Sequence, residues 1–118
     1  MDKGSSERFP RSFRIVRSSD YRIIYGEGRK VESHKLVLFV RNNQLGHPRL
    51  GITVSRKVGG AVVRNRIKRL FREIFRRSRE YIPDSFDLVV NARQSCAGAD
   101  YGLLREEFLA AVRKASRP

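Results

Sequence analysis

The side chains in this sequence that could do chemistry are mainly arginines. Residues 56–79 hold ten basic and one acidic side chain, a net charge of +9 out of +14 for the whole chain. Most of these cations are arginines, whose planar guanidinium group binds phosphate through two hydrogen bonds at once. Gly59-Gly60 lie just before the helix that carries most of them, and a helix start offers free N–H groups to an anion. The pattern predicts binding to a phosphate-bearing partner.

Few residues suit catalysis by the protein itself. The chain has two histidines, His34 and His47, and one cysteine, Cys96. The spacing of these three residues is not typical of metal ligands. The sequence also contains neither a Walker phosphate-binding motif nor a G-x-S-x-G nucleophile elbow. We interpret the histidines as surface or turn residues and the cysteine as an inert thiol. We therefore expect no catalytic residue and no metal ligand, and binding is a better prediction than catalysis.

Length and composition fit one small basic domain. The 118 residues are 40% hydrophobic, which is enough for a single core. No apolar run approaches the about 20 residues that span a bilayer, and the polar start of the chain does not resemble a secretory signal. We expect one nucleic-acid-binding domain over residues 1–118, with a flexible basic arm over residues 1–12, located in the cytoplasm without membrane attachment. The excess of positive charge indicates RNA or DNA as the partner.

The elements that must position the cations follow from the hydrophobic pattern. A short helix is expected after Ser18 or Ser19 as its cap, ending at Gly26 or Gly28, with two tyrosines four residues apart on one face. Segments rich in β-formers predict strands over Lys35–Arg41, Arg49–Arg56 and Phe86–Ala92. Residues 31–34 either extend the first of these strands or remain a loop, and the order of elements leaves room for an extra strand early in the chain.

Two longer helices complete the expected α+β domain, in which helices pack on one small sheet. Apolar residues from Val63 to Phe75 recur at helical spacing, and Pro83 follows that helix. The last helix is expected to start at Asp100 as its cap. Burial of the first apolar stripe turns a row of cations to the opposite side: Lys68, Arg69, Arg72, Arg76 and Arg79.

The segment from Arg56 to Arg69 resembles the protein subunit of bacterial ribonuclease P. The similarity is carried by Arg64-Asn65-Arg66, followed directly by Ile67-Lys68-Arg69, with a basic pair and a glycine turn before them. It extends to Ser19–Gly28, to Leu50–Ser55 and to Asp87–Arg93, and covers roughly residues 9–115. Gly60 departs from the pattern, because many members have asparagine there.

The resemblance implies an α-β-β-β-α-β-α sandwich, a small sheet with a left-handed β-α-β crossover, as in some ribosomal proteins. It also implies the non-catalytic protein subunit of an endoribonuclease whose active site lies on the RNA subunit. Mg²⁺ would be held mainly by that RNA and by the substrate. The protein would bind ribonuclease P RNA and the 5′ leader of precursor tRNA, and would aid endonucleolytic removal of the leader in tRNA 5′ maturation. No obligatory protein partner is implied.

The resemblance also assigns residues by position. The leader would lie in a cleft between the first helix and the sheet, lined or flanked by Tyr21, Tyr25, Val37, Phe39, Thr53, Arg64 and Asn65. The catalytic RNA would contact Arg56, Lys57, Arg66, Lys68, Arg69 and Arg72. A shallow basic groove with aromatic walls suits an extended strand, and we expect little base readout because leaders differ in sequence.

Other functions remain open from the residues alone. A ribosomal or RNA-chaperone-like protein would carry the same charge, but it would not change the cleavage of precursor tRNA. A protein-only nuclease would cut without an RNA cofactor, which the scarcity of carboxylates disfavours. A DNA-binding helix would need the mixed polar side chains that read bases, rather than cations along its whole outer face. A membrane-surface helix is disfavoured because its apolar stripe is needed for the core.

Overall fold

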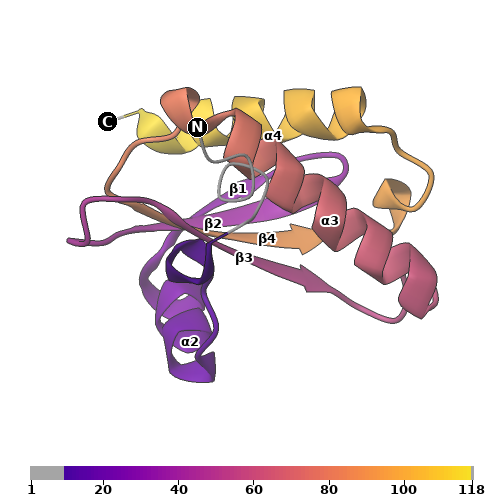
Figure 1. The fold of residues 1–118 in the computed structure, drawn as a ribbon, viewed down its shortest axis with the longest axis horizontal. Helices are drawn as coiled ribbons and strands as arrows, with labels where there is room; N and C mark the ends of the chain where they lie inside the picture. Colours follow the sequence, from indigo (N-terminus) through magenta and orange to yellow (C-terminus); the bar gives the residue numbers. More distant parts are fainter. Residues whose placement is uncertain (1–9, 118) are drawn as a thin grey trace.

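The computed structural model describes residues 10–117, and within them it contains three α-helices and one four-stranded sheet (Figure 1). The main elements are α2 (Ser18–Glu27), β1 (Arg29–Glu32), β2 (Leu36–Asn42), β3 (Arg49–Val54), α3 (Ala61–Arg77), β4 (Phe86–Ala92) and α4 (Tyr101–Ser116). Three short 3-10 turns are η1 (Arg11–Phe13), η2 (Arg79–Tyr81) and η3 (Gln94–Cys96). The α-β-β-β-α-β-α order expected from the resemblance is confirmed.

The sheet is mixed, with the strand order β1-β2-β4-β3. β1 pairs antiparallel with β2, and β2 pairs antiparallel with β4. β3 and β4 are parallel neighbours, so the chain must cross over between them, and α3 forms that crossover. The hand of the crossover stays a prediction from the resemblance.

The two faces of the sheet are covered differently. α3 and α4 lie on one side and α2 on the other (Figure 1). Because side chains alternate along a strand, every second residue joins the main core under α3 and α4. The fully buried members of this core include Leu36, Leu38, Leu88, Val90, Ile67, Phe71, Ile74, Phe75, Leu104 and Phe108. α2 covers the opposite face through a smaller cluster, in which Ile24 and Ile15 pack on Val89.

The ends of the first helix differ from the sequence prediction. The cap is Arg17 rather than Ser18 or Ser19, because the Arg17 carbonyl accepts hydrogen bonds from the N–H groups of Asp20 and Tyr21. The helix ends before Gly28 as expected. A Cβ at Gly28 would lie 2.5 Å from the carbonyl oxygen of Ile24, so glycine is required there by close packing. The Asp100 cap of α4 is confirmed, since its carboxylate accepts the N–H of Leu103 at 2.9 Å.

Two strand boundaries also differ. The chain around Val31 neither extends β2 nor remains a loop. It forms β1, the extra early strand for which the sequence left room, and this strand folds back on β2. β3 ends at Val54, not at Arg56, because a turn follows in which the N–H of Val58 donates to the carbonyl of Ser55.

The predicted basic arm over residues 1–12 falls mostly on residues 1–9, which lie outside the described residues. Directly after η1, Arg14 forms a parallel bridge with Leu50, and the buried Ile15 donates its N–H to the Leu50 carbonyl at 3.0 Å. The chain therefore joins the edge of β3 before it enters α2. None of the helices within residues 10–117 has the length and apolar character needed to cross a membrane.

Candidate nucleic-acid interface

The Tyr21 ring packs closely on the sheet because β3 has a glycine beneath it. A Cβ at Gly51 would come within 2.6 Å of the Tyr21 hydroxyl and within 2.9 Å of its ring. Burial raises the pKa of Tyr21, with a smaller contribution from the neighbouring Tyr25. The phenol therefore stays protonated at neutral pH, and the ring forms a fixed wall beside β3.

Tyr25 lies about one helical turn after Tyr21 on the same face of α2 and also contacts the sheet. Its ring stands edge-on to Phe39, with 4.8 Å between the ring centroids. Its hydroxyl donates to Oδ1 of Asn91 at 2.8 Å and lies 3.2 Å from Oγ1 of Thr53. Val37 is the register partner of Asn91 on the other neighbouring strand. We call this group, Tyr25, Val37, Phe39, Thr53 and Asn91, the tyrosine surface.

The structure thus brings together four residues predicted for the leader and adds Asn91, which the sequence reasoning missed. Strand alternation was the signal that could have found it. Asp87, Val89 and Asn91 must share one face of β4, and Val89 is the residue that α2 covers.

A pocket of about 290 Å³ joins Tyr21 to the basic helix. It is lined by Arg14, Ile15, Val16, Tyr21, Leu50, Gly51, Ile52, Lys68 and Arg72. Three cations and no acid contribute to this lining. Burial lowers the pKa of Arg72, and the nearby charge of Arg14 lowers it further. Both effects favour an anion in this pocket, because an anion would offset the repulsion between the cations. Arg14 was not predicted from the sequence.

The start of α3 positions the central basic motif. Nε of Arg64 donates to the carbonyl of Gly59 at 3.1 Å, and the Arg66 guanidinium donates to the carbonyl of Ala99 at 3.1 Å. Asn65 lies between them and is exposed. No hydrogen bond or ring contact among residues 10–117 joins this motif to the tyrosine surface. The two parts of the predicted leader site are therefore not linked by direct hydrogen bonds or ring contacts among the described residues.

The glycine turn before α3 needs only one of its two glycines for close packing. A Cβ at Gly59 would come within 2.9 Å of Val63, whereas a Cβ at Gly60 would meet nothing within 4 Å. The departure at Gly60 therefore has no steric cause. Arg56, Lys57 and Arg69 are exposed around this end of the helix.

The row of cations on α3 is divided by its one acid. Glu73 binds Nη2 of Arg76 and Nε of Arg77, both at 2.6 Å. The hydrogen bond from Arg76 is the largest cause of the lowered pKa of Glu73. The Arg79 guanidinium lies 5.1 Å from the centre of the Phe13 ring. The second half of the row is thus occupied within the protein, while Lys68 and Arg72 line the cationic pocket described above.

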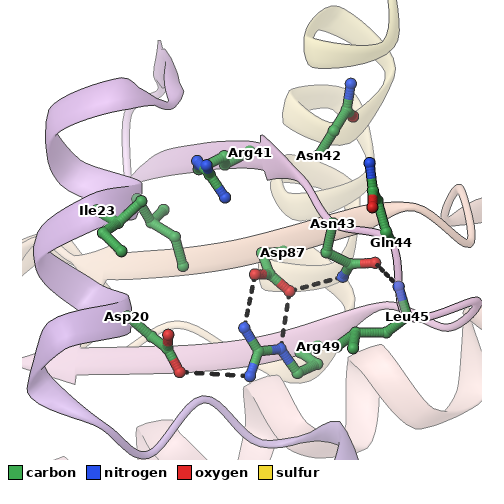
Figure 2. Close-up of a pocket in the computed structure, with 10 residues that line it drawn as sticks. Asp20, Ile23, Arg41, Asn42, Asn43, Gln44, Leu45, Arg49 and Asp87 are labelled. Atoms are coloured by element: carbon green, nitrogen blue, oxygen red, sulfur yellow. Dashed lines mark hydrogen bonds and ion pairs between the residues drawn. The ribbon is translucent and has the colours of Figure 1, made fainter.

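The other flank of α2 is held by charges (Figure 2). Asp87 is 3% exposed and accepts from Nε of Arg49 at 2.9 Å, from Nη2 of Arg49 at 2.7 Å and from Nδ2 of Asn43 at 2.7 Å. The same guanidinium reaches Asp20 on α2 at 3.5 Å. Near the end of α2, Glu27 pairs with Arg41 of β2 at 3.0 Å. We call this side, Asp20, Glu27, Arg41, Arg49 and Asp87, the ion-pair flank. None of these five residues was predicted from the sequence to contact a ligand.

The described residues do not build a metal site of the usual kind. No group of three or more His, Cys, Asp or Glu side chains with metal-binding proximity occurs within residues 10–117. Cys96 is buried, and burial raises the pKa of its thiol to about 11. The thiol is therefore protonated at neutral pH.

Sequence comparison places this geometry among known proteins. The profile of the ribonuclease P family matches residues 9–116. The ribonuclease P protein component of Thermotoga maritima is 39% identical over 88% of this chain and 92% of its own length. That of Alkaliphilus metalliredigens is 37% identical over 86% of this chain and 91% of its own length.

Solved structures agree with the sequence comparison. A Staphylococcus aureus RNase P protein mutant with defective mRNA degradation activity superposes with a TM-score of 0.85, at 31% identity and with 98% of each chain covered. The RNase P protein from Thermotoga maritima superposes with a TM-score of 0.80, at 36% identity, covering 86% of this chain and 96% of that one. The similarity therefore includes both the fold and the sequence over most of the chain.

Proposed function

This chain belongs to the ribonuclease P protein family, and from that premise we propose that it binds precursor tRNA on α2 and the sheet, and the catalytic RNA on α3. As a ribonuclease P protein component it binds RNA, takes part in tRNA processing and forms part of an endoribonuclease that works with an RNA subunit. The proposal concerns which surface serves which RNA, and where the chemistry takes place.

We assign the 5′ leader of precursor tRNA to the tyrosine surface together with Tyr21. Unpaired bases stack on aromatic rings, and each stacked base contributes about 1–3 kcal/mol. The edge-on pair of Tyr25 and Phe39 provides such a platform, with Val37 and Thr53 beside it. Arg64 and Asn65 belong to the first turns of α3, and in this proposal they meet the precursor there.

We assign the catalytic RNA to the first half of α3 and the turn before it: Arg56, Lys57, Arg66, Lys68, Arg69 and Arg72. Glu73, the one acid of α3, pairs with Arg76 and Arg77 in the following turn. It therefore does not neutralise the cations in the first half of the helix. Arg66 uses part of its guanidinium on backbone carbonyls of the loop after η3. Because a guanidinium carries five N–H donors, the rest can still bind phosphate.

One observation carries the proposal: the pocket that Tyr21 shares with Lys68 and Arg72. It is the point where the aromatic side of α2 meets the basic side of α3. A strand that follows the tyrosines therefore reaches the cations of the helix without leaving the surface. This continuity supports a single path in which substrate and catalytic RNA lie against one another, with protein cations reducing the repulsion between two polyanions.

We place the catalytic step on the RNA subunit, with Mg²⁺ held by that RNA and by substrate phosphates. Three acids on the elements that form the two surfaces are each paired with arginine: Asp20 on α2, Glu73 on α3 and Asp87 on β4. They are thereby occupied in holding the fold and are poorly suited to hold a metal ion. In the same proposal the chain works as one RNA-binding domain over residues 1–118, in the cytoplasm and without an obligatory protein partner.

The test is single-turnover cleavage of a 5′-extended precursor tRNA at low Mg²⁺ concentration. Three mixtures are compared: the protein alone, a bacterial ribonuclease P RNA alone, and both together. We expect cleavage only in the combined mixture, and tighter binding of precursor than of mature tRNA by the reconstituted enzyme. Cleavage by the protein alone would move the active site to this chain, and equal affinity for the two tRNAs would overturn the leader assignment.

A further inference from the structure

The turn that carries Lys57 lies outside the helices and strands. It spans residues 55–60, between β3 and α3. Val58 is buried, and its N–H donates to the carbonyl of Ser55 at 3.1 Å, whereas Lys57 is exposed. Gly59-Gly60 follow, and glycine leaves the backbone a wide choice of conformations. A lysine in such a turn keeps one direction only if another part of the chain holds its backbone.

Gln94 holds the backbone of this turn from η3. Its Nε2 donates to the carbonyl oxygen of Lys57 at 3.2 Å, across 37 positions of the sequence. The hydrogen bond uses the main chain of Lys57 and not its ammonium group. The exposed side chain of Lys57 therefore stays accessible to an RNA phosphate while its carbonyl is held.

η3 is a firm support because hydrogen bonds tie it to the turn between β1 and β2. The Ser95 hydroxyl donates to the carbonyl of His34 at 3.0 Å, and the N–H of Arg93 donates to the carbonyl of Lys35 at 2.9 Å. The buried Cys96 thiol donates to the same Lys35 carbonyl at 3.1 Å, which the raised pKa of this thiol permits. These three hydrogen bonds fix the position of η3 without a ligand.

The loop after η3 also binds α3 itself. The Arg66 guanidinium donates to the carbonyl of Ala99 at 3.1 Å and to that of Ala97 at 3.5 Å. Gln94 thus holds the chain before Gly59-Gly60, and Arg66 holds the chain after them, against one connected segment. The basic turn and the start of α3 are thereby kept in a fixed relation to each other.

We propose that Gln94 is a positioning residue for the catalytic RNA: by holding the Lys57 carbonyl, it keeps the Lys57 ammonium directed at an RNA phosphate. Gln94 itself needs no contact with the RNA for this. A backbone that is already ordered loses less conformational freedom when the RNA binds, so the phosphate contact becomes stronger. This inference rests on the proposed contact between Lys57 and the catalytic RNA and deepens it.

The test is a double-mutant cycle, measured as the affinity of the protein for a bacterial ribonuclease P RNA over a range of salt concentrations. Lys57→Met removes the ammonium and should reduce the slope of log affinity against log salt by about 0.7–0.9, the effect of one lost phosphate contact. Gln94→Met removes the donor from an unbranched side chain. It should weaken binding about fivefold, the effect of one hydrogen bond, and should also reduce the slope. The double variant should bind no more weakly than Lys57→Met alone.

Two controls separate positioning from a general loss of structure. Gln44→Met makes the same change at the other glutamine of the chain, which is exposed between β2 and β3, and should keep the full affinity. In Gln94→Met the ratio of precursor to mature tRNA affinity should stay unchanged in the reconstituted enzyme, because that ratio depends on the tyrosine surface. A merely structural role of Gln94 would leave the salt slope unchanged and would add its loss to that of Lys57→Met.

Two results would overturn the inference, and they differ in what else they reject. If Gln94→Met binds the RNA as tightly as the unaltered protein, or if the two losses multiply in the double variant, Gln94 does not act through Lys57. The contact between Lys57 and the RNA then stands without it. If Lys57→Met changes neither the affinity nor the slope, the assignment of Lys57 to the catalytic RNA is wrong and this inference is rejected with it.

Discussion

The two flanks of α2 are attached to the same sheet by different chemistry. On the ion-pair flank, Asp87 is buried and takes three hydrogen bonds from Arg49 and Asn43 (Figure 2). On the tyrosine surface, one phenol hydroxyl reaches Thr53 and Asn91, and much of the group is open to solvent. The first flank has its polar groups satisfied within the fold, whereas the second leaves rings and hydrogen-bonding groups partly open to solvent. A helix attached firmly along one side can thus present the other side as a binding surface of constant shape.

The largest effect is expected from Arg49→Met on the ion-pair flank. The change leaves Asp87 buried with Asn43 as its one remaining side-chain hydrogen-bond partner among residues 10–117, and breaking a buried ion pair costs about 3–5 kcal/mol. The free energy of unfolding, measured by urea titration, should fall by that amount. Arg41→Met removes an exposed arginine from the same flank and is the control. Equal effects of the two changes would contradict the distinction between a buried anchor and an exposed pair.

A smaller effect, and on binding rather than on folding, is expected from Gly51→Ala. The new methyl group would meet the far end of the Tyr21 side chain at 2.6 Å, so the ring must move while the backbone stays in place. Loss of a stacking wall worth about 1–3 kcal/mol should weaken precursor binding about tenfold, with mature tRNA affinity unchanged.

Gly26→Ala provides the control for that change, because a Cβ at Gly26 meets nothing within 4 Å. It keeps the fold and should leave precursor affinity as it is. If Gly51→Ala and Gly26→Ala bind precursor equally well, the Tyr21 ring is not part of the leader surface.

Most of the fold could be predicted because the apolar periodicity of each element is regular. The stripe from Val63 to Phe75 indicated α3, and its buried members include Ile67, Phe71 and Ile74. The short pieces were harder. β1 carries only Val31 as an apolar residue, so pairing with β2 rather than its own pattern makes it a strand. Local propensity cannot reveal such a strand, because its stability comes from a partner elsewhere in the chain.

The sequence was sufficient to predict which types of residue form the candidate site. It was less informative about which residues pair with one another there. The tyrosines and the basic helix could be identified because their spacing is local. The pairing of Arg49 with Asp87 and of Tyr25 with Asn91 spans 38 and 66 residues, and it depends on the register between strands. A buried acid in the strand segment Phe86–Ala92 was a visible signal that a cation must lie beside it. Which cation does so follows only from the β3–β4 register.

On the tyrosine surface, Tyr25→Phe should have a modest effect on folding. The ring and its edge-on contact with Phe39 are kept, and the hydrogen bonds to Asn91 and Thr53 are lost. A partly exposed hydrogen bond contributes about 0.5–1.5 kcal/mol, so the free energy of unfolding should fall by about 1 kcal/mol. Average precursor affinity should stay within about threefold because stacking is retained. A loss as large as that of Arg49→Met would mean that the hydroxyl anchors α2, and the comparison of the two flanks would fail.

The smallest effect is expected from Glu27→Gln, which removes the second ion pair of the ion-pair flank. Both partners are exposed, with 64% of the Glu27 side chain and 39% of the Arg41 side chain open to solvent. Exposed pairs contribute about 0–1 kcal/mol and are screened by salt. The free energy of unfolding should therefore fall by about 0.5 kcal/mol in dilute buffer and by less in 1 M salt. The loss caused by Arg49→Met should persist in 1 M salt, because Asp87 is buried and shielded from solvent ions. A salt-resistant loss of several kcal/mol in Glu27→Gln would show that α2 is held at both ends of this flank, and that the buried carboxylate of Asp87 is not its single strong anchor.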